Sequence, residues 1–278
     1  MIGAGLILPR FLNTENKDFM DFATIIGIGA GLLLIGSAIA VKPGALMFIN
    51  LPSMIIVFGG TLAATLVNFP MKDFLGMMKI VNNAFTHKMM EVNQIVTSLV
   101  TMSRKARVEG LLSLEKDINN LDDEFLKKGL QLMVDGTEAE MLRDIMSIEL
   151  SYLEDRHIQG QDMLKAMATY APAFGMAGTL IGLIQMLQQL NDPTQIGGGM
   201  ATALITTFYG VVLANLFCIP LAGKLKTRTK TEMLGKELII EGICSIQAGD
   251  NPRLLQDKLI TFIAPKHRQA ARSSSEEK

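Results

Sequence analysis

The sequence predicts an all-α integral membrane protein with four transmembrane helices and a helical cytoplasmic domain. The 278-residue chain is 49% hydrophobic and only 19% charged, with a net charge of −1, which is typical of a membrane protein with a sizeable soluble part. Four apolar segments reach the length of about 20 residues that a helix needs to cross the hydrocarbon layer. The polar remainder shows helical rather than strand-like periodicity.

Hydropathy and charge divide the chain into consecutive segments. In order, these are an N-terminal segment at 1–20, transmembrane helix 1 at 21–41, transmembrane helix 2 at 51–69, a cytoplasmic helical loop at 70–168, transmembrane helix 3 at 169–190, transmembrane helix 4 at 199–222 and a cytoplasmic tail at 223–278. The N-terminal segment lacks the basic-then-apolar order of a signal peptide, and Met20 is an alternative start.

The first two spans are joined by a short turn, Lys42-Pro43-Gly44, and Pro70 closes the second span. Glycines recur in the first span at positions 27, 29, 31 and 36. Small residues let helix backbones approach closely in a membrane, so we expect these glycines to mark packing against another helix. The alternative is that membrane helices simply tolerate glycine.

The loop between the second and third spans contains amphipathic helices. One apolar face at helical spacing comprises Val92, Ile95, Val96, Leu99 and Met102. A second apolar stripe continues toward the third span and comprises Met141, Ile145, Ile148 and Tyr152. We expect both stripes to face a core, and we expect Gly160 to interrupt the second helix.

The third and fourth spans, YAPAFGMAGTLIGLIQMLQQL and GGGMATALITTFYGVVLANLFCIPLA, contain no charged side chain and many small residues. On the fourth span a narrow stripe, with Thr207 beside it, comprises Thr202, Thr206, Gly210, Ala214 and Cys218. On the third span the matching residues are Ala171, Gly175, Gly178, Thr179 and Gly182. Such faces predict a tight contact, either with each other or with a partner helix.

The distribution of basic residues predicts the orientation. The two short turns contain one basic residue, Lys42, whereas the large loop and the tail contain nearly all the others, including a cluster at 224–230. The positive-inside rule places the loop, the tail and both termini in the cytoplasm. We therefore expect a multi-pass membrane protein with a cytoplasmic helical domain and with spans that contact membrane lipid.

No span contains a carboxylate, Lys, Arg or His at membrane depth. An ion path normally needs an ionisable group there, so a partner must contribute the acid if this chain conducts ions. The chain itself offers neutral oxygens: the hydroxyls of Thr179, Thr206 and Thr207, and carbonyls freed by Pro172 and Pro220. The alternative is that each threonine bonds to its own helix and each proline only bends one.

Other classes of function lack support in the sequence. The near-zero net charge gives no nucleic-acid footprint, and two cysteines and three histidines give no metal-site spacing. No nucleophile–base set or phosphate-binding loop is visible. We therefore expect no enzyme activity and no cofactor other than a transported cation.

Several passages resemble the flagellar motor stator A-subunit family, MotA/PomA, from about Met20 to Pro265. They are MSRKARVEGLLSLE, GLQLMVDGTEAEMLR, DRHIQGQDML, APAFGMAGTLIGLIQML and ALITTFYGVVLANLFCIPLAGKL. The motifs GTLIGL and TTFYG are closer to the sodium-type members, so we expect sodium rather than a proton as the transported cation. The residues before the first span are more numerous than the family suggests.

The resemblance implies a ring of five A subunits around two copies of a B subunit, MotB/PomB, whose membrane helix supplies an Asp. It implies that Arg107 and Glu115 contact the rotor protein FliG, where Val108 replaces a second basic residue of some sodium-type members. The resemblance also gives Pro172 and Pro220 the role of helix-end prolines for coupling. By the same resemblance, Thr179, Thr206 and Thr207 belong to the ion path.

Alternatives remain for both the function and the residues. A related ExbB/TolQ-type ring powers outer-membrane processes, but such proteins have three spans and a different loop placement. A passive scaffold would tolerate Thr206→Ala and Thr207→Ala without loss of motility or ion flux. Without the resemblance, Arg107 and Glu115 would be interpreted as part of a solvated helix face.

Overall fold

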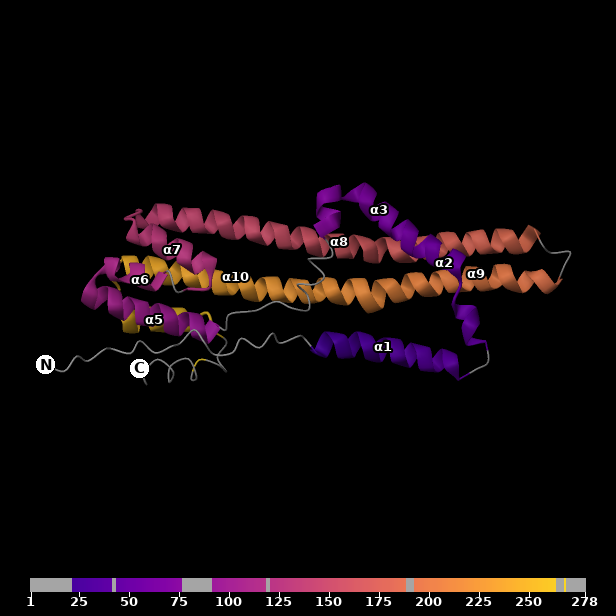
Figure 1. Cartoon of the computed structure of the whole chain (residues 1–278), viewed down its shortest axis with the longest axis horizontal. Coiled ribbons are helices and arrows are strands. Elements are labelled where there is room, and N and C mark those ends of the chain that lie inside the picture. The colour runs from indigo at the N-terminus through magenta and orange to yellow at the C-terminus, as the bar shows by residue number, and fades with distance from the viewer. Residues whose placement is uncertain are drawn as a thin grey trace. The chain divides into compact units, whose positions relative to one another are not determined.

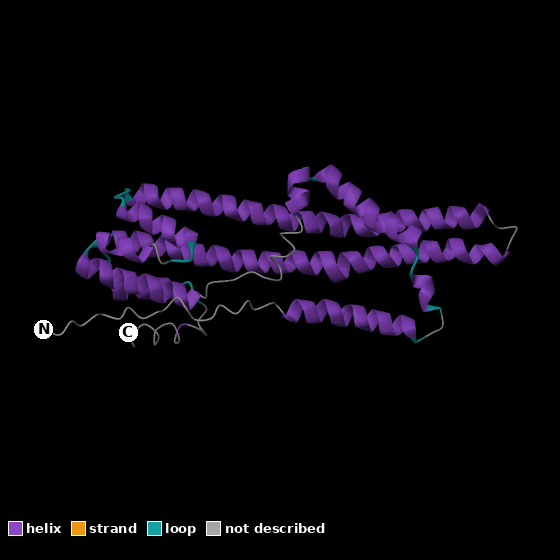
Figure 2. Ribbon diagram, viewed as in Figure 1, coloured by secondary structure: helices purple, strands orange, loops and turns teal. Residues whose placement is uncertain are grey.

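The computed structural model describes residues 22–41, 44–76, 92–118, 121–188, 193–263 and 268, and every regular element in this part of the chain is helical (Figure 2). The predicted all-α fold class is confirmed. The elements in order are α1 Phe22–Ala40, η1 Ala45–Phe48, α2 Leu51–Met54, η2 Ile55–Gly59, α3 Gly60–Asn68, α5 Val92–Glu109, η3 Leu111–Leu114, α6 Glu115–Ile118, α7 Glu124–Val134, α8 Ala139–Gln188, α9 Pro193–Val212, η4 Leu213–Cys218, α10 Ile219–Gln247 and α11 Pro252–Ile260. The N-terminal segment 1–20 and the turn residues Lys42 and Pro43 lie outside the described residues.

In the part of the chain that the structure describes, four helical segments are long and apolar enough to cross a membrane. They lie at Ala23–Ala40, Ala45–Asn68, Ala139–Gln188 and Ile196–Gln247. The last two are much longer than a bilayer requires, because α8 and α10 continue well beyond the apolar sequence (Figure 1). The exact limits of the spans and of the polar loop therefore stay predictions.

The chain divides into two compact units, and α8 and α10 contribute residues to both. Unit 1 includes Lys88–Glu154 and Thr229–Lys278, and unit 2 includes Phe19–His87 and Asp155–Arg228. Unit 1 contains the helices of the polar sequence, whereas unit 2 contains the apolar ones. Each unit is described separately below.

Unit 1 has a core of large apolar side chains contributed by α5, η3, α6, α7, α8, α10 and α11. Its wholly buried members include Leu99, Leu114, Leu126, Leu130, Met133, Leu142, Met146, Leu238, Ile239 and Ile243. The predicted apolar face of α5 is confirmed, since Ile95, Val96, Leu99 and Met102 are buried. The Asp123 side chain caps α7 by accepting a hydrogen bond from the Leu126 N–H at 2.8 Å.

The predicted apolar face of α8 was wrong by about one position. Met141, Ile148 and Tyr152 are 57–67% exposed, whereas Leu142 and Met146 are buried. Both stripes have helical spacing, so periodicity alone did not distinguish them. The expected interruption at Gly160 was also wrong, because α8 is continuous from Ala139 to Gln188. One glycine costs a helix only about 1 kcal/mol.

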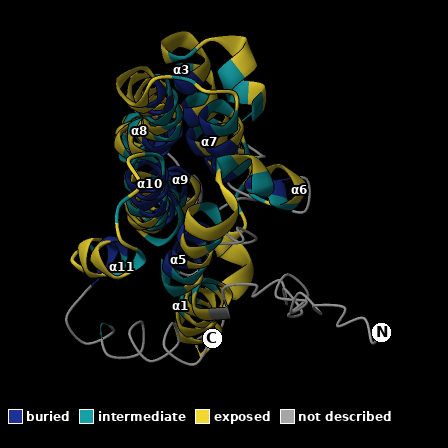
Figure 3. Cartoon of the chain, turned by 90° about the vertical axis from the view of Figure 1, so that its left-hand side faces the viewer, coloured by how far each residue is buried: buried dark blue, intermediate teal, exposed yellow. Residues whose placement is uncertain are grey.

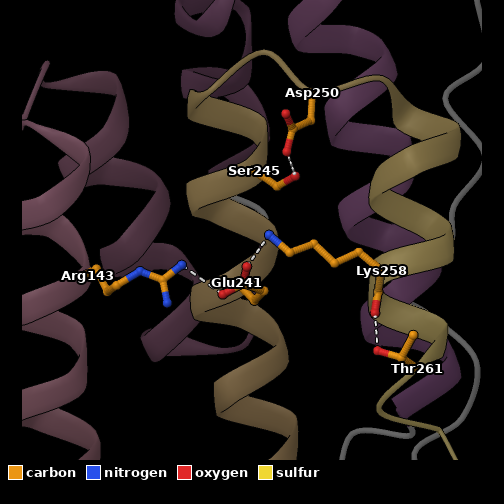
Figure 4. Close-up of polar contacts among 6 residues, drawn as sticks. All are labelled: Arg143, Glu241, Ser245, Asp250, Lys258 and Thr261. Atoms are coloured by element: carbon orange, nitrogen blue, oxygen red, sulfur yellow. Dashed lines mark hydrogen bonds and ion pairs between the residues drawn. The ribbon is translucent and has the colours of Figure 1, made fainter.

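An ion-pair network joins α8, α10 and α11 within unit 1 (Figure 4). The Glu241 carboxylate accepts from Arg143 Nη2 at 2.7 Å and pairs with the Lys258 ammonium. Burial would raise the pKa of Glu241, but the hydrogen bonds and positive charges of Lys258 and Arg143 outweigh it and lower that pKa. Glu241 is therefore held ionised at the meeting point of three helices.

Unit 2 packs α8 against α9 and leaves large apolar side chains on its surface. Helix α1 is almost wholly exposed in Figure 3, with Leu33 at 70% and Leu34 at 67%. It contacts η4, where a Cβ on Gly31 would lie 2.6 Å from the Leu216 side chain, and the Lys224 ammonium of α10 donates to the Thr24 hydroxyl. An apolar surface of this kind suits contact with lipid or with another membrane helix.

Two short π-helical segments interrupt the apolar helices of unit 2. The first, η2, lies in the second span, and the second, η4, ends two residues before Pro220. Proline lacks a backbone N–H and clashes with the preceding turn, and a π segment is one way for a helix to accommodate such a distortion.

Candidate functional site

Glycines bring the backbones of α8 and α9 into direct contact. A Cβ on Gly210 would lie 2.5 Å from the Ala171 carbonyl oxygen, and a Cβ on Gly182 would lie 2.6 Å from the Ala203 nitrogen. No side chain fits at either position unless the backbone moves. The small faces of the third and fourth spans therefore contact each other, which was one of the two predicted arrangements.

This close approach brings together the hydroxyls of Thr179 on α8 and Thr207 on α9. Their Oγ1 atoms lie 2.6 Å apart. Thr179 Oγ1 also lies 3.0 Å from the Ala203 carbonyl oxygen and 3.1 Å from that of Gly175. Four neutral oxygens thus gather at one point between the two helices, and we name this group the oxygen cluster.

Thr206 lies beside the oxygen cluster but bonds to its own helix. The side chain is wholly buried, and its Oγ1 lies 2.9 Å from both the Thr202 and the Ala203 carbonyl oxygens. Its methyl side faces Gly178, where a Cβ would lie 2.5 Å from Thr206 Cγ2. Thr206 therefore bonds to its own helix, which was the alternative interpretation for these threonines. The Ala203 carbonyl oxygen, which belongs to the oxygen cluster, is nevertheless one of its two partners.

The two prolines occupy different settings. Pro172 lies inside α8 and contacts α9, since a Cβ on Gly210 would lie 3.1 Å from Pro172 Cα. Pro220 is exposed and follows η4 near the start of α10. Pro172 therefore adjoins the glycine contact that holds the oxygen cluster, whereas Pro220 faces outward. Their coupling role stays a prediction.

The oxygen cluster has the ligand type of a hard cation but no charge. Hydroxyl and carbonyl oxygens suit such ions, and a bare ion in a membrane needs a counter-charge that these groups lack. Among the described residues, no group of three His, Cys, Asp or Glu side chains could hold a metal ion. The arrangement suits transient passage of a cation better than permanent binding.

The candidate rotor residues lie in unit 1, at the turn between α5 and α6. Arg107 and Glu115 are both exposed. Gly110 makes the turn with a φ of 87°, which favours glycine, and Lys105 pairs with Asp117 at 2.6 Å. Two exposed side chains of opposite charge therefore lie near a turn whose flanking helices are joined by the Lys105–Asp117 ion pair.

The sequence analysis missed Asn50, Ser53 and Tyr209, which form a polar contact between α2 and α9. Asn50 Oδ1 accepts from the Ser53 N–H at 3.0 Å, and Asn50 Nδ2 lies 3.5 Å from Thr202 Oγ1. An Asn followed by Pro52 at the start of an apolar run is a helix N-cap signature, and that signal could have identified Asn50. No local signal points to Tyr209.

Comparison with known proteins reveals relatives along nearly the whole chain. The family described as the MotA/TolQ/ExbB proton channel family matches residues 117–237. Motility protein A of Treponema pallidum (strain Nichols) is 38% identical over 250 residues, which are 90% of this chain and 96% of the relative. Motility protein A of Aquifex aeolicus (strain VF5) is 42% identical over 241 residues, which are 86% of this chain and 95% of the relative. Chemotaxis protein PomA of Vibrio alginolyticus is 38% identical over 245 residues, which are 88% and 96% of the two chains.

Solved structures show the same fold. The flagellar MotAB stator complex from Bacillus subtilis contains a chain that matches with a TM-score of 0.84 and 31% identity, over 90% of this chain and 99% of that chain. The C. jejuni MotAB structure matches with a TM-score of 0.83 and 27% identity, over 88% and 97% of the two chains. Members of this family are components of ion channels and not enzymes. This chain therefore belongs to the MotA/PomA family, within the MotA/TolQ/ExbB proton channel family.

Proposed function

We propose that this protein is the A subunit of a flagellar motor stator, which couples a flow of cations across the bacterial inner membrane to torque on the rotor. The main support is that relatives named motility protein A match 86–90% of this chain. The structures that match it over similar lengths are MotAB complexes. This likeness favours a stator over an ExbB/TolQ-type energiser.

The absence of an acidic side chain from the membrane spans of this chain indicates what its partner must supply. Because the chain has no carboxylate at membrane depth, a B subunit of the MotB/PomB type supplies the Asp that a cation neutralises. Five copies of this chain surround two copies of that partner. The loop, the tail and both termini lie in the cytoplasm, as the basic residues indicate.

The oxygen cluster provides this chain's side of the ion path. A cation that approaches the partner's Asp meets the hydroxyls of Thr179 and Thr207 and the carbonyls of Gly175 and Ala203. These oxygens replace part of its hydration shell as it passes. Each elementary charge that falls through 100 mV releases about 2.3 kcal/mol, which is the drive available for each step of rotation.

The ring transmits torque to the rotor through the exposed region that includes Arg107 and Glu115. These charges contact FliG, and Pro172 and Pro220 link movement near the ion path to the cytoplasmic helices. Because both charges are exposed, the contact is electrostatic and weakens as salt screens it. Val108 and Leu112 are 85% and 72% exposed beside them and add apolar surface to the same turn.

Substitution of the oxygen cluster tests the proposal. The chain and its cognate B subunit are expressed in a host that lacks its own stator, and swimming speed and ion flux are measured. We expect Thr179→Val and Thr207→Val to abolish swimming, because each removes a ligand oxygen at nearly constant volume, and we expect Thr179→Ser to retain it. Thr65→Val removes a buried hydroxyl that bonds to its own helix in the second span, and it serves as the matched control.

A passive scaffold predicts a different result. If Thr179→Val, Thr206→Ala and Thr207→Ala all swim and conduct like the unaltered protein, then the hydroxyls have no part in transport. The stator proposal would then lose its structural basis in this chain.

Sodium is the cation that we propose, on the basis of the threonine hydroxyls and of the GTLIGL and TTFYG motifs. Swimming speed against external sodium at fixed pH decides this point. Speed should rise with sodium and then saturate. Indifference to sodium, together with a dependence on external pH, would assign the path to protons instead.

A further inference from the structure

The candidate membrane segment Ala45–Asn68, which begins six residues before the predicted second span at 51–69, contains a break in its backbone near its start. Between η1 and α2, Ile49 and Asn50 are not helical, although the candidate span runs from Ala45 to Asn68. Irregular backbone within a membrane must find partners in the protein. The Tyr209 hydroxyl of α9 provides them, because it donates to the Phe48 carbonyl and lies 3.4 Å from the Asn50 nitrogen, whose N–H it accepts.

Asn50 links this break to both α2 and α9. Its Oδ1 accepts from the Ser53 hydroxyl at 2.9 Å as well as from the Ser53 N–H. Its Nδ2 reaches toward Thr202 Oγ1 at 3.5 Å. A single amide therefore caps α2 and contacts α9, which fixes the position of the first turn of α2 along α9.

Ser53 connects this contact to the ion path. Its side chain is wholly buried, and its Oγ lies 3.4 Å from the Thr202 carbonyl oxygen. The same carbonyl accepts from Thr206 Oγ1 at 2.9 Å. The single Ser53 hydroxyl proton is shared between Asn50 Oδ1 at 2.9 Å and this carbonyl at 3.4 Å. Side chains from two helices thus meet at the carbonyl of the residue that precedes Ala203 of the oxygen cluster.

The polar series continues without interruption into the cluster. Thr206 Oγ1 lies 2.9 Å from Ala203 O, and Thr179 Oγ1 lies 3.0 Å from the same atom. Thr179 Oγ1 then reaches Thr207 Oγ1 at 2.6 Å. A turn or slide of α9 relative to α8 would change both distances from Thr179, because Ala203 and Thr207 lie one turn apart on α9.

We propose that Asn50, Ser53 and Tyr209 are positioning residues that hold α9 in the register at which its threonines face α8. They bind no cation themselves and act through Thr202 and Thr206. This inference rests on the proposed ion path. It adds the second span, which also packs Gly60 against Phe174 of the third span, to the elements that set the affinity for the driving ion.

The test separates ion affinity from assembly. Swimming speed is measured in cells with the cognate B subunit while sodium is titrated at fixed pH and pH is varied at fixed sodium, and the amount of protein in the membrane is measured by immunoblot. We expect Tyr209→Phe and Ser53→Ala to raise the half-maximal concentration of the driving ion about 5-fold, the equivalent of one lost hydrogen bond of about 1 kcal/mol. Ser53→Thr restores the hydroxyl and should return the value toward that of the unaltered protein.

Ser37→Ala is the matched control. The Ser37 hydroxyl bonds to the Leu34 carbonyl at 2.9 Å within the exposed helix α1, so its loss should leave the half-maximal concentration unchanged. If Ser53→Ala does not accumulate in the membrane, the half-maximal ion concentration of Tyr209→Phe tests the inference instead. Tyr209→Phe keeps the aromatic ring and removes only the hydroxyl.

The outcomes distinguish this inference from the proposed function. Ion-dependent swimming of the unaltered protein, with Tyr209→Phe showing an unchanged half-maximal concentration, would overturn the positioning role alone. A variant with reduced amount and reduced maximal speed but unchanged half-maximal concentration would show a merely structural role and would also overturn it. Absence of any ion-dependent swimming in the unaltered protein would instead refute the proposed function.

Discussion

The two units of this chain bury opposite kinds of side chain where their helices pack together. In unit 1, large side chains such as Leu99 and Leu126 are wholly buried. In unit 2, α8 meets α9 through glycines and threonines, beside a small buried apolar cluster that includes Leu164 and Leu221. Large side chains such as Leu33 and Leu204 are 67–70% exposed. The two units therefore differ in which side chains they place inside, as well as in the hydrophobicity of their helices.

The difference follows from the solvent around each unit. In water, the burial of apolar area stabilises a core by about 25 cal/mol for each Å², so large side chains go inside. In a membrane, lipid tails are as apolar as leucine, and helices associate through close backbone packing and hydrogen bonds instead. A substitution should therefore have a different effect in each unit, and the predictions below use that contrast.

The largest effect should come from a cavity in the core of unit 1. Leu126→Ala should lower the free energy of unfolding of this unit by about 2–5 kcal/mol, because it removes buried apolar contacts and leaves a void. Leu112→Ala, at a site that is 72% exposed, should change it by no more than about 0.5 kcal/mol. Hydrogen–deuterium exchange of peptides from unit 1 in the detergent-solubilised protein measures both. Equal protection from exchange in Leu126→Ala and Leu112→Ala would contradict the placement of Leu126 in the core of unit 1.

A single added methyl group should have the next largest effect, in unit 2. Gly210→Ala should destabilise the protein by about 1–3 kcal/mol, since its Cβ would lie 2.5 Å from the Ala171 carbonyl oxygen and backbone cannot yield easily. Gly223→Ala, where nothing lies within 4 Å, should be neutral or slightly stabilising. Thermal unfolding midpoints by circular dichroism compare the two. A midpoint for Gly210→Ala equal to that of Gly223→Ala would disprove the backbone contact.

Much of the fold could be predicted from the sequence because it depends on local patterns. Membrane length, apolar composition and helical spacing lie in consecutive residues, so the four spans and the buried face of α5 followed directly. The stripes of α8 could not be ranked, because residues 141 and 142 begin stripes of equal periodicity. Leu142 is the buried one because it belongs to the tertiary core of unit 1, which the sequence of α8 alone does not reveal.

Part of the candidate site could likewise be predicted from the sequence, and part could not. The small faces of the third and fourth spans predicted a tight contact, and the structure shows that Thr179 meets Thr207 within it. Asn50 and Tyr209 were missed, since they are 159 residues apart and no periodicity connects them. Arg107 and Glu115 rest on family resemblance, because the structure shows only that they are exposed.

A smaller effect should come from charge in unit 1. Glu241→Gln should lower the free energy of unfolding at pH 7 by about 1 kcal/mol, because the pairs with Arg143 and Lys258 are lost. The pKa of Glu241 is lowered in the folded protein. The stabilisation is therefore fully present above the unfolded value of about 4.3 and disappears as the pH falls through the folded value.

Denaturant titrations from pH 7 down to pH 3 follow this difference between the unaltered protein and Glu241→Gln. Glu149→Gln removes a more exposed pair with Lys128 and should cost less than about 0.5 kcal/mol throughout. A difference for Glu241→Gln that persists unchanged to pH 3 would rule out the ion pairs as its source.

The last effect is of about the same size but should have the opposite sign, and it concerns a buried hydroxyl without a hydrogen-bond partner. In the described part of the protein, Thr61 Oγ1 is buried without a hydrogen-bond partner, whereas Thr65 Oγ1 one turn later donates to the Thr61 carbonyl at 2.7 Å. An unpaired buried hydroxyl is costly, and an apolar group of the same shape removes that cost. Thr61→Val should therefore raise stability by about 1 kcal/mol, while Thr65→Val should lower it by about 0.5–1 kcal/mol. Thermal midpoints of the two variants, in the assembled complex and in the dissociated subunit, measure both effects. If Thr61→Val destabilises only the complex, then the hydroxyl has its partner on a neighbouring chain, and the second span is part of an intersubunit contact.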